Sequence, residues 1–340
     1  MAHCMNTSRL IVLATGGTIA GIAGDAMRHD YQPGQIGIDQ WLDDAGALGI
    51  DARLTGKQIA NMGSEDVGPD IWARLHKEIS YAIADPECDG IIVTHGTDTA
   101  EETAFALDLT LPVTKPIVLV GAMRPADAVG SDGMRNFVNA VRVASDPDAS
   151  GRGVLLVMGD RVLAARDARK VRTRGTDDAF RGFPRGSVAL VTPSALEWFG
   201  LPWRTEEGAR FAFPGDWPQD WPRVPVLYIS AGVETALVGR LADGGDTLSP
   251  ARGLIVVGVG EGNMPKPVRD DLARRAGAGL MVVRASRVDE GIVDHEPRDD
   301  HAGFIASRAL NPQKARILLM ILLANGVTDV ADIQAAFDNP

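Results

Sequence analysis

Short runs of apolar, often β-branched residues recur along the chain, and each is bounded by glycine, proline or charged residues. They read LIVLA (10–14), GIIVTHG (90–96), PIVLVGAM (116–123), GVLLVMGD (153–160), VPVLYIS (224–230), GLIVVGVG (253–260) and LMVVRAS (280–286). Their apolar character is continuous rather than alternating, which is typical of strands covered on both faces. We therefore predict strands of parallel sheets at these positions.

Helical patterns lie between these strands, at 100–110, 133–145 and 268–279. Strands that alternate with helices predict crossover units and parallel sheets. A further helix is predicted in the segment NPQKARILLMILLANG, with Asn311 as N-cap, Pro312 at the first helical position and an end at Gly326.

The stretch from 200 to 225 does not follow this alternation of strands and helices, because it is rich in Trp, Pro, Gly and charged residues. A chain of 340 residues is long enough for two domains. We expect an α/β protein of two domains. The larger N-terminal domain, 1–200, has a mostly parallel sheet flanked by helices. A linker follows at 201–224, and then a smaller C-terminal α/β domain at 225–340.

Composition and charge exclude several classes of protein. Apolar residues make up 45% of the chain, yet no run is long enough to span a membrane. The net charge of −11 argues against nucleic acid as the main partner, because phosphate binding needs a basic face. Two cysteines, Cys4 and Cys88, make neither a disulfide framework nor a zinc site. The first residues lack a secretory pattern, so we expect a cytoplasmic protein, or a periplasmic one if a signal segment was removed.

Ligands of open parallel sheets collect beyond the carboxyl ends of the strands, so the loops after the strands are the candidates for chemistry. One such loop reads VTHGTDTAEETA, at 93–104. Asp98 and Thr99 each precede a glutamate by three residues, which is a capping-box pattern. That interpretation leaves Thr97 unexplained. The alternative is that Asp98 receives an ammonium group of a ligand.

The first such loop, ATGGTIAG at 14–21, is unusual in placing hydroxyls on both sides of two glycines. It fits neither the G-x-G-x-x-G pattern of dinucleotide-binding turns nor a phosphate-binding loop. Glycines such as Gly17 let the backbone approach a ligand closely and offer N–H donors. A threonine there, Thr18, can attack a carbonyl while N–H groups stabilise the oxyanion. Its proton needs an acceptor, such as a tyrosinate or a lysine.

Two charged stretches have alternative interpretations. The run DRVLAARDARKVRTRG, at 160–175, favours a solvated surface, and Lys170 matters only if a threonine lies nearby in space. The segment DHEPRDDH, at 294–301, sets His295 and His301 among carboxylates without a standard zinc spacing. It favours a polar loop before a strand. We expect neither a metal nor a cofactor.

The motifs LATGGTIAG, THGTDTAEETA, VGAMRP followed by SDG, and LNPQKAR together resemble the bacterial L-asparaginase and glutaminase-asparaginase family, closest to its type II members. The resemblance covers nearly the whole chain. It implies an amidohydrolase that converts L-asparagine to L-aspartate and ammonia through a threonine acyl-enzyme, without cofactor. Activity on L-glutamine is left open.

The resemblance also implies roles for individual residues. The nucleophile is Thr18, activated by Tyr31 of a lid segment. Thr97, Asp98 and Lys170 form a second set of catalytic groups. The substrate would be bound by Gly17, Ser64, Glu65, Thr97, Asp98, Ala122 and Asn263. Asn263 and Glu296 are implied to reach the site of a neighbouring subunit, with Glu296 close to the tyrosine.

The family usually forms a tetramer of two intimate dimers, so we expect a homo-oligomer. No partner for Cys88 is present, so the disulfide of some exported relatives is not expected. Other hypotheses are a broad-specificity glutaminase-asparaginase, an inactive amino-acid-binding sensor, a dinucleotide-dependent oxidoreductase and an amidotransferase subunit that acts on charged transfer RNA.

Overall fold

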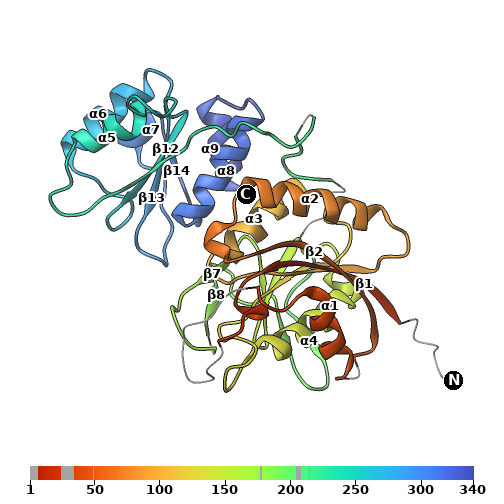
Figure 1. Ribbon diagram of the computed structural model, residues 1–340. Helices are drawn as coiled ribbons and strands as arrows, with labels where there is room; N and C mark the ends of the chain where they lie inside the picture. Colours follow the sequence, from red (N-terminus) through yellow and green to blue (C-terminus); the bar gives the residue numbers. More distant parts are fainter. Residues whose placement is uncertain (1–6, 24–33, 49, 177, 204–207, 214) are drawn as a thin grey trace. The chain divides into compact units, whose positions relative to one another are not determined.

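A computed structural model describes residues 7–23, 34–48, 50–176, 178–203, 208–213 and 215–340 (Figure 1). The chain forms two compact units, residues 1–210 and 211–340. They are described separately below. The finer boundaries expected from the sequence, with a linker at 201–224, stay a prediction.

The first unit is built on an eight-stranded sheet of order β10-β9-β6-β5-β4-β3-β1-β2. Five neighbouring strands are parallel: β1 (Ser8–Gly16), β2 (Ala52–Met62), β3 (Gly90–Thr94), β4 (Ile117–Val120) and β5 (Val154–Met158). Three strands at the other end pair antiparallel: β6 (Arg161–Ala164), β9 (Ala189–Val191) and β10 (Leu196–Trp198). The predicted mostly parallel sheet is thereby confirmed.

Helices cover both faces of this sheet (Figure 1). On one face lie α1 (Ile38–Gly46) and α4 (Gly133–Ala144), where Trp41 packs edge-on against Phe137. On the other face lie α2 (Pro69–Ala84) and α3 (Ala100–Thr110), whose apolar residues join a second core cluster. Every residue of β3, β4 and β5 is buried, which explains the continuous apolar runs of these strands.

The edge strand β2 follows a different rule. Its first residues alternate between partly buried and exposed positions, because only one side of an edge strand is fully covered. The described part of this unit also contains three short 3-10 helices: η1 (Thr18–Ala20), η2 (Ser64–Asp66) and η3 (Pro147–Ala149). The first two directly follow β1 and β2.

The basic stretch 160–175 is not a solvated surface throughout, so that interpretation is wrong for its middle part. It contains β6 and then β7 (Ala168–Lys170), which pairs antiparallel with β8 (Phe180–Gly182) in a separate two-stranded ribbon. Asp167 and Arg169 are buried there. This part of the stretch therefore buries charged residues as well as the apolar Ala168.

The second unit has a parallel four-stranded sheet of order β11-β12-β13-β14. Its strands are β11 (Val226–Tyr228), β12 (Gly253–Gly258), β13 (Met281–Ser286) and β14 (Phe304–Ala306). Its helices are α5 (Ala236–Asp243), α6 (Lys266–Ala276), α7 (Pro297–His301), α8 (Pro312–Ala324) and α9 (Val330–Asp338). The predicted cap of α8 is confirmed, since the Asn311 side chain accepts a hydrogen bond from the Lys314 amide.

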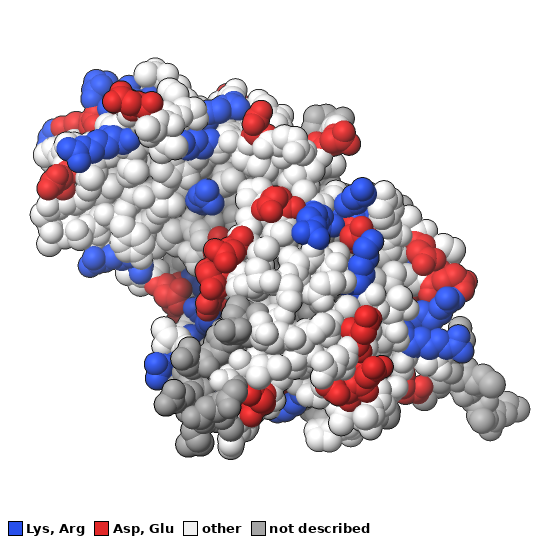
Figure 2. Space-filling view, in the orientation of Figure 1, with Lys and Arg blue, Asp and Glu red and all other residues white. Residues whose placement is uncertain are grey.

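The surface is mixed in charge. On the face drawn in Figure 2, described Lys and Arg side chains are interspersed with Asp and Glu. None of the helices in the described ranges is long and apolar enough to cross a membrane.

Candidate active site

Sheet topology gathers four loops at one edge of the first unit. The strands β4, β3, β1 and β2 are adjacent and parallel, so their carboxyl ends lie side by side. The ladders run up to Gly16 beside Met62 and to Thr94 beside Val120. The loops after these strands therefore start at similar positions along the strand direction. Neighbouring strands are about 4.8 Å apart, which is close enough for side chains of adjacent loops to meet.

Two glycines allow these loops to touch. A Cβ on Gly17 would lie 2.4 Å from the Gly96 Cα, and Gly17 adopts a positive φ of 80°. A Cβ on Gly96 would lie 2.7 Å from the Ser64 Cβ. Thr18 and Thr97 each follow one of the contacting glycines, so the two candidate threonines lie on abutting turns. Both threonines are buried.

The backbone amide of Gly17 is already engaged within the protein. It donates to the Met62 carbonyl oxygen over 2.9 Å, which ties the end of β1 to β2. The sequence suggested that this glycine offers its N–H to a ligand. In the structure the small size of Gly17 allows close approach between the loops, and its place among the substrate-binding residues stays a prediction.

A lysine, a threonine and an aspartate meet beside this contact. The Lys170 ammonium donates to the Thr97 hydroxyl oxygen over 2.8 Å and forms an ion pair with the Asp98 carboxylate. The lysine side chain is only 16% exposed, whereas that of Asp98 is 62% exposed. Lys170 and Thr97 are 73 positions apart in the chain. The condition set by the sequence analysis, a threonine close to Lys170 in space, is therefore met. Asp98 keeps an open side toward solvent.

Ser64 connects the loop after β2 with the loop after β3. Its hydroxyl oxygen accepts from the Asp98 amide over 3.1 Å, and its carbonyl oxygen accepts from the Thr99 hydroxyl over 2.6 Å. Thr99 occupies the N-cap position of α3 but makes no side-chain cap bond. The capping-box interpretation of Thr99 is therefore wrong, because its hydroxyl joins two loops instead. Glu65 is exposed, and its carboxylate lies against Gly63.

The loop after β4 is held by a residue that the sequence analysis did not single out. Ala122 is fully buried in that loop. The Asp132 carboxylate accepts from the amides of Met123 and Arg124 at 3.1 and 3.0 Å, and from the Asn136 side-chain amide at 3.0 Å. The motif SDG just before α4 was the available signal: an aspartate there can bind the amides of a preceding loop.

His95, inside the same loop as Thr97, ends a buried chain of hydrogen bonds. The Trp72 indole N–H donates to the Thr103 hydroxyl, which lies 3.0 Å from His95 Nε2. His95 Nδ1 lies 2.7 Å from the Gly96 carbonyl oxygen, which can only accept. Nδ1 therefore carries a proton. Complete burial lowers the pKa of His95 from 6.5 to about 4.

The remaining candidates lie elsewhere in the chain. Tyr31 falls outside the described residues. Asn263 and Glu296 belong to the second unit. Asn263 closes the turn after β12, where its backbone pairs with Val259 in an isolated antiparallel bridge. Glu296 is the residue before α7 and forms an ion pair with Arg298 over 3.0 Å.

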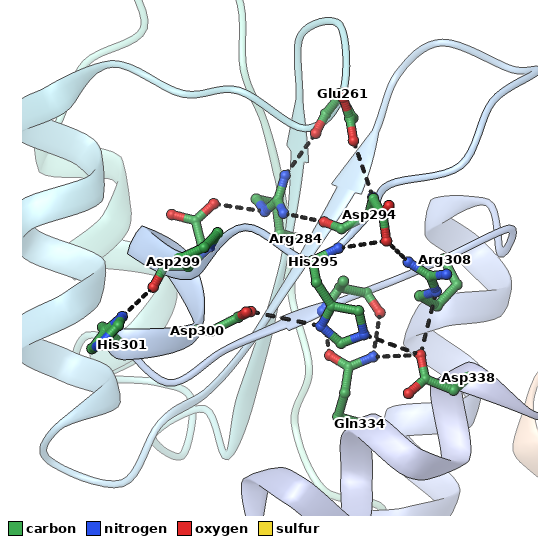
Figure 3. A network of polar contacts seen from close by, with 12 residues as sticks. Glu261, Arg284, Asp294, His295, Asp299, Asp300, His301, Arg308, Gln334 and Asp338 are labelled. Atoms are coloured by element: carbon green, nitrogen blue, oxygen red, sulfur yellow. Dashed lines mark hydrogen bonds and ion pairs between the residues drawn. The ribbon is translucent and has the colours of Figure 1, made fainter.

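The segment 294–301 is not a plain polar loop, so that interpretation is corrected (Figure 3). Its second part, Pro297–His301, forms α7, and Asp299 of this helix is 1% exposed. The Asp299 carboxylate forms ion pairs with two buried arginines, Arg269 and, at 2.8 Å, Arg284. Burying these charges is tolerable only because they are paired. Within the described ranges, no group of three or more His, Cys, Asp or Glu residues is placed to hold a metal ion.

Comparison with known proteins identifies the class. Residues 9–204 match the family described as "Asparaginase, N-terminal", and residues 223–337 match the "Glutaminase/Asparaginase C-terminal domain". The chain belongs to the asparaginase family.

Individual relatives match over nearly their whole length. The chain is 38% identical to "L-asparaginase 2" of Escherichia coli (strain K12), over 97% of this chain and 92% of the relative. It is 34% identical to "Glutaminase-asparaginase" of Pseudomonas fluorescens biotype A, over 97% and 90%. The crystal structure of a "Probable Cytoplasmic L-asparaginase from Campylobacter jejuni" superposes with a TM-score of 0.90, at 34% identity, covering 98% of this chain and all of the other.

Proposed function

We propose that this protein is an L-asparaginase, which hydrolyses the side-chain amide of L-asparagine to give L-aspartate and ammonia. The observation that carries the proposal is the contact of Lys170 with Thr97 and Asp98. Thr97 and Asp98 lie on a turn that packs against the turn of Thr18. An amide is a poor electrophile, so its hydrolysis needs a nucleophile, a proton acceptor and oxyanion stabilisation in one place.

The reaction follows two steps. The Thr18 hydroxyl attacks the amide carbonyl and gives up its proton. The candidate acceptors are Tyr31 as its tyrosinate, and Lys170 acting through Thr97 once the Lys170 ammonium has passed a proton to its partner Asp98. The C–N bond then breaks, ammonia leaves with the proton, and an ester on Thr18 remains. In the second step water attacks this ester through the same groups, so that aspartate is released and the threonine hydroxyl is restored.

Charge complementarity supports an α-amino acid as substrate. The exposed Asp98 carboxylate, with Glu65 nearby on η2, suits the α-ammonium group. Ser64 suits the α-carboxylate. Sites with such paired polar groups reject analogues that leave a group unpaired.

Activity on L-glutamine is a second candidate, favoured by the similarity to the glutaminase-asparaginase of P. fluorescens. Initial rates on L-asparagine, D-asparagine and L-glutamine over a range of concentrations distinguish the two candidates. A preference for L-asparagine in kcat/KM supports the first proposal, and comparable values for both L-amides support the second.

The nucleophile is tested directly. Thr18→Ala is expected to abolish ammonia release from L-asparagine, and Lys170→Met to lower it by about 100-fold or more, because a proton acceptor typically contributes that much. Ammonia is measured by a coupled assay, and circular dichroism checks folding. A matched control is Thr110→Val, which removes a buried helix hydroxyl bonded to the Ala106 carbonyl. Full activity in folded Thr18→Ala would disprove the role of Thr18.

Assembly is also proposed from the family resemblance. The protein would form a homo-oligomer, a tetramer of two intimate dimers, in which Asn263 and Glu296 of one subunit complete the site of another.

A further inference from the structure

In the second unit, one buried guanidinium connects the two turns that carry Asn263 and Glu296. Arg284 lies in the middle of β13, between β12 and β14, and is 4% exposed. Its Nη1 donates to the Glu261 carbonyl oxygen over 2.7 Å, and its Nη2 donates to the Asp294 carbonyl oxygen over 2.5 Å. Each of these carbonyls lies two residues before one of the two candidates. Figure 3 shows Arg284 between the two turns.

The guanidinium of Arg284 also forms an ion pair with a carboxylate. Arg284 Nε lies 2.8 Å from the Asp299 carboxylate of α7, and this aspartate is also paired with Arg269. Glu296 directly precedes α7, so the same contact holds the helix that follows it. A planar guanidinium with five N–H donors can bind three partners at once, which the single ammonium of lysine cannot do in the same geometry.

Two further contacts connect the turn of Asn263 with the turn of Glu296 and with Arg284. The Asp294 amide lies 3.3 Å from the Glu261 carboxylate oxygen that accepts from it, which is a direct bond between the turns. Gly262 has a φ of 84°, and a Cβ there would lie 2.9 Å from the Arg284 Cγ. The turn of Asn263 therefore closes directly over the arginine stem.

We propose that Arg284 is a positioning residue for catalysis, which sets the places of Asn263 and Glu296 together through the backbone of their two turns. The proposal rests on the proposed function, in which these two residues serve the site of a neighbouring subunit. Arg284 itself touches no substrate. Its loss moves groups that must be placed within a fraction of an ångström.

The first experiment measures Arg284→Gln and Arg284→Lys in the full-length protein. A displacement of about 1 Å of a positioning contact can cost about 100-fold in rate, so kcat on L-asparagine is expected to fall about 10- to 100-fold in both variants. The matched control is Arg275→Gln, another largely buried arginine of the same unit, which pairs with Asp243 and Asp271 instead. It is expected to keep the wild-type kcat. Wild-type kcat in folded Arg284→Gln and Arg284→Lys would overturn the proposal.

The second experiment separates positioning from a general structural defect. Chains carrying Thr18→Ala and chains carrying Arg284→Lys are co-expressed with different affinity tags, and mixed assemblies are purified through both tags. In a symmetric pair, one of the two sites then combines an intact Thr18 with intact turns from the other chain, so about half of the wild-type activity is expected. A defect confined to the folding of the Arg284→Lys chain would not be repaired in this way.

A parallel mixture of Thr18→Ala with Asn263→Ala tests the proposed function itself. If that mixture regains activity and the Arg284→Lys mixture does not, the inference about Arg284 is wrong and the shared site stands. If the Asn263→Ala mixture also stays inactive, the shared site of the proposed function is wrong.

Discussion

At the scale of single residues, the segment THGTDT at 94–99 distributes its polar groups among different partners. Thr97 contacts Lys170, Thr99 bonds to the Ser64 carbonyl, and His95 bonds to the Gly96 carbonyl. Only the first of these contacts belongs to the proposed chemistry. The others fix the turn on which that chemistry depends: the His95 contact is local, whereas the Thr99 contact reaches a segment 35 positions earlier in the chain.

The neutral, buried His95 makes the stability of the protein depend on pH. Its pKa is about 4 in the folded protein and near 6.5 when exposed, so between these values the unfolded chain binds a proton that the folded one does not. The contribution of the neutral His95 to the free energy of unfolding is fully present above pH 6.5. It is lost progressively as the pH falls toward 4 and does not change further below that value. A shift of this size corresponds to about 3 kcal/mol.

Urea unfolding of the wild type and of His95→Gln at pH 7 and pH 4, at equal protein concentration, measures this effect. Between pH 7 and pH 4 the free energy of unfolding is expected to fall more in the wild type than in His95→Gln. The difference between the two losses is expected to be about 3 kcal/mol. Equal losses in the two proteins would show that His95 does not titrate between these values.

At the scale of elements, the β7–β8 ribbon carries Lys170 on strands of only three residues each. Such a ribbon is marginal by itself, so it needs anchoring. The buried Asp167 supplies it: its carbonyl oxygen accepts from the Phe183 amide over 3.0 Å, and its carboxylate forms an ion pair with Arg185 over 2.6 Å. These contacts join the two strands at the end of the ribbon away from its connecting loop.

Asp167→Asn is therefore expected to loosen the ribbon and lower kcat on L-asparagine by about tenfold, because Lys170 is no longer held at one distance from Thr97. KM is expected to change little. Steady-state kinetics measure both values, and Glu87→Gln, which removes the exposed ion pair with Arg9, is the control. If Asp167→Asn and Glu87→Gln behave alike, the anchor has no part in placing the lysine.

Elements differ in how much the sequence says about them. The buried strands and the helices α3, α4, α6 and α8 were predictable. A strand covered on both faces must be apolar throughout, helical patterns alternate with these strands, and α8 also carries its Asn311 cap. The edge strand β2 was not, because its residues alternate like those of many loops. The ribbon of Lys170 was misread as solvated surface, since pairing of Asp167 with Arg185 across 18 positions leaves no local signal.

Candidate residues divide in the same way. Thr18, Thr97 and Asp98 follow buried strands and were singled out from that place alone, although the catalytic role predicted for Thr97 came from the resemblance. Assigning Lys170 needed the family resemblance, and Asp132 and Arg284 were missed, because each acts through backbone groups that sequence does not reveal as partners. Roles that depend on a neighbouring subunit could come only from the resemblance.

At the scale of the whole molecule, candidate groups are divided between two units. Thr18, Thr97, Asp98 and Lys170 lie in the first unit, and Asn263 and Glu296 lie in the second. If a neighbouring subunit supplies the latter pair, activity belongs to the assembly. A monomer would hold every residue type of the site and still be nearly inactive.

Gel filtration with ammonia release assayed across the profile tests this expectation. Activity per milligram is expected to follow the oligomer peak and to fall on dilution into conditions that yield monomer. Reconcentration should restore it. A monomer peak with undiminished kcat on L-asparagine would contradict a site shared between subunits.

The glycine contacts among the loops after β1, β2 and β3 also bear on how this protein can vary over evolutionary time. At the carboxyl edge of the sheet, one methyl group on Gly17 or Gly96 would collide with backbone or with Ser64. The turns at the opposite edge, such as 85–89 before β3, carry none of the candidate groups. We therefore expect insertions in the turn at 85–89 to impair activity less than insertions in the loops of Gly17 and Gly96, where the close packing requires the smallest residues.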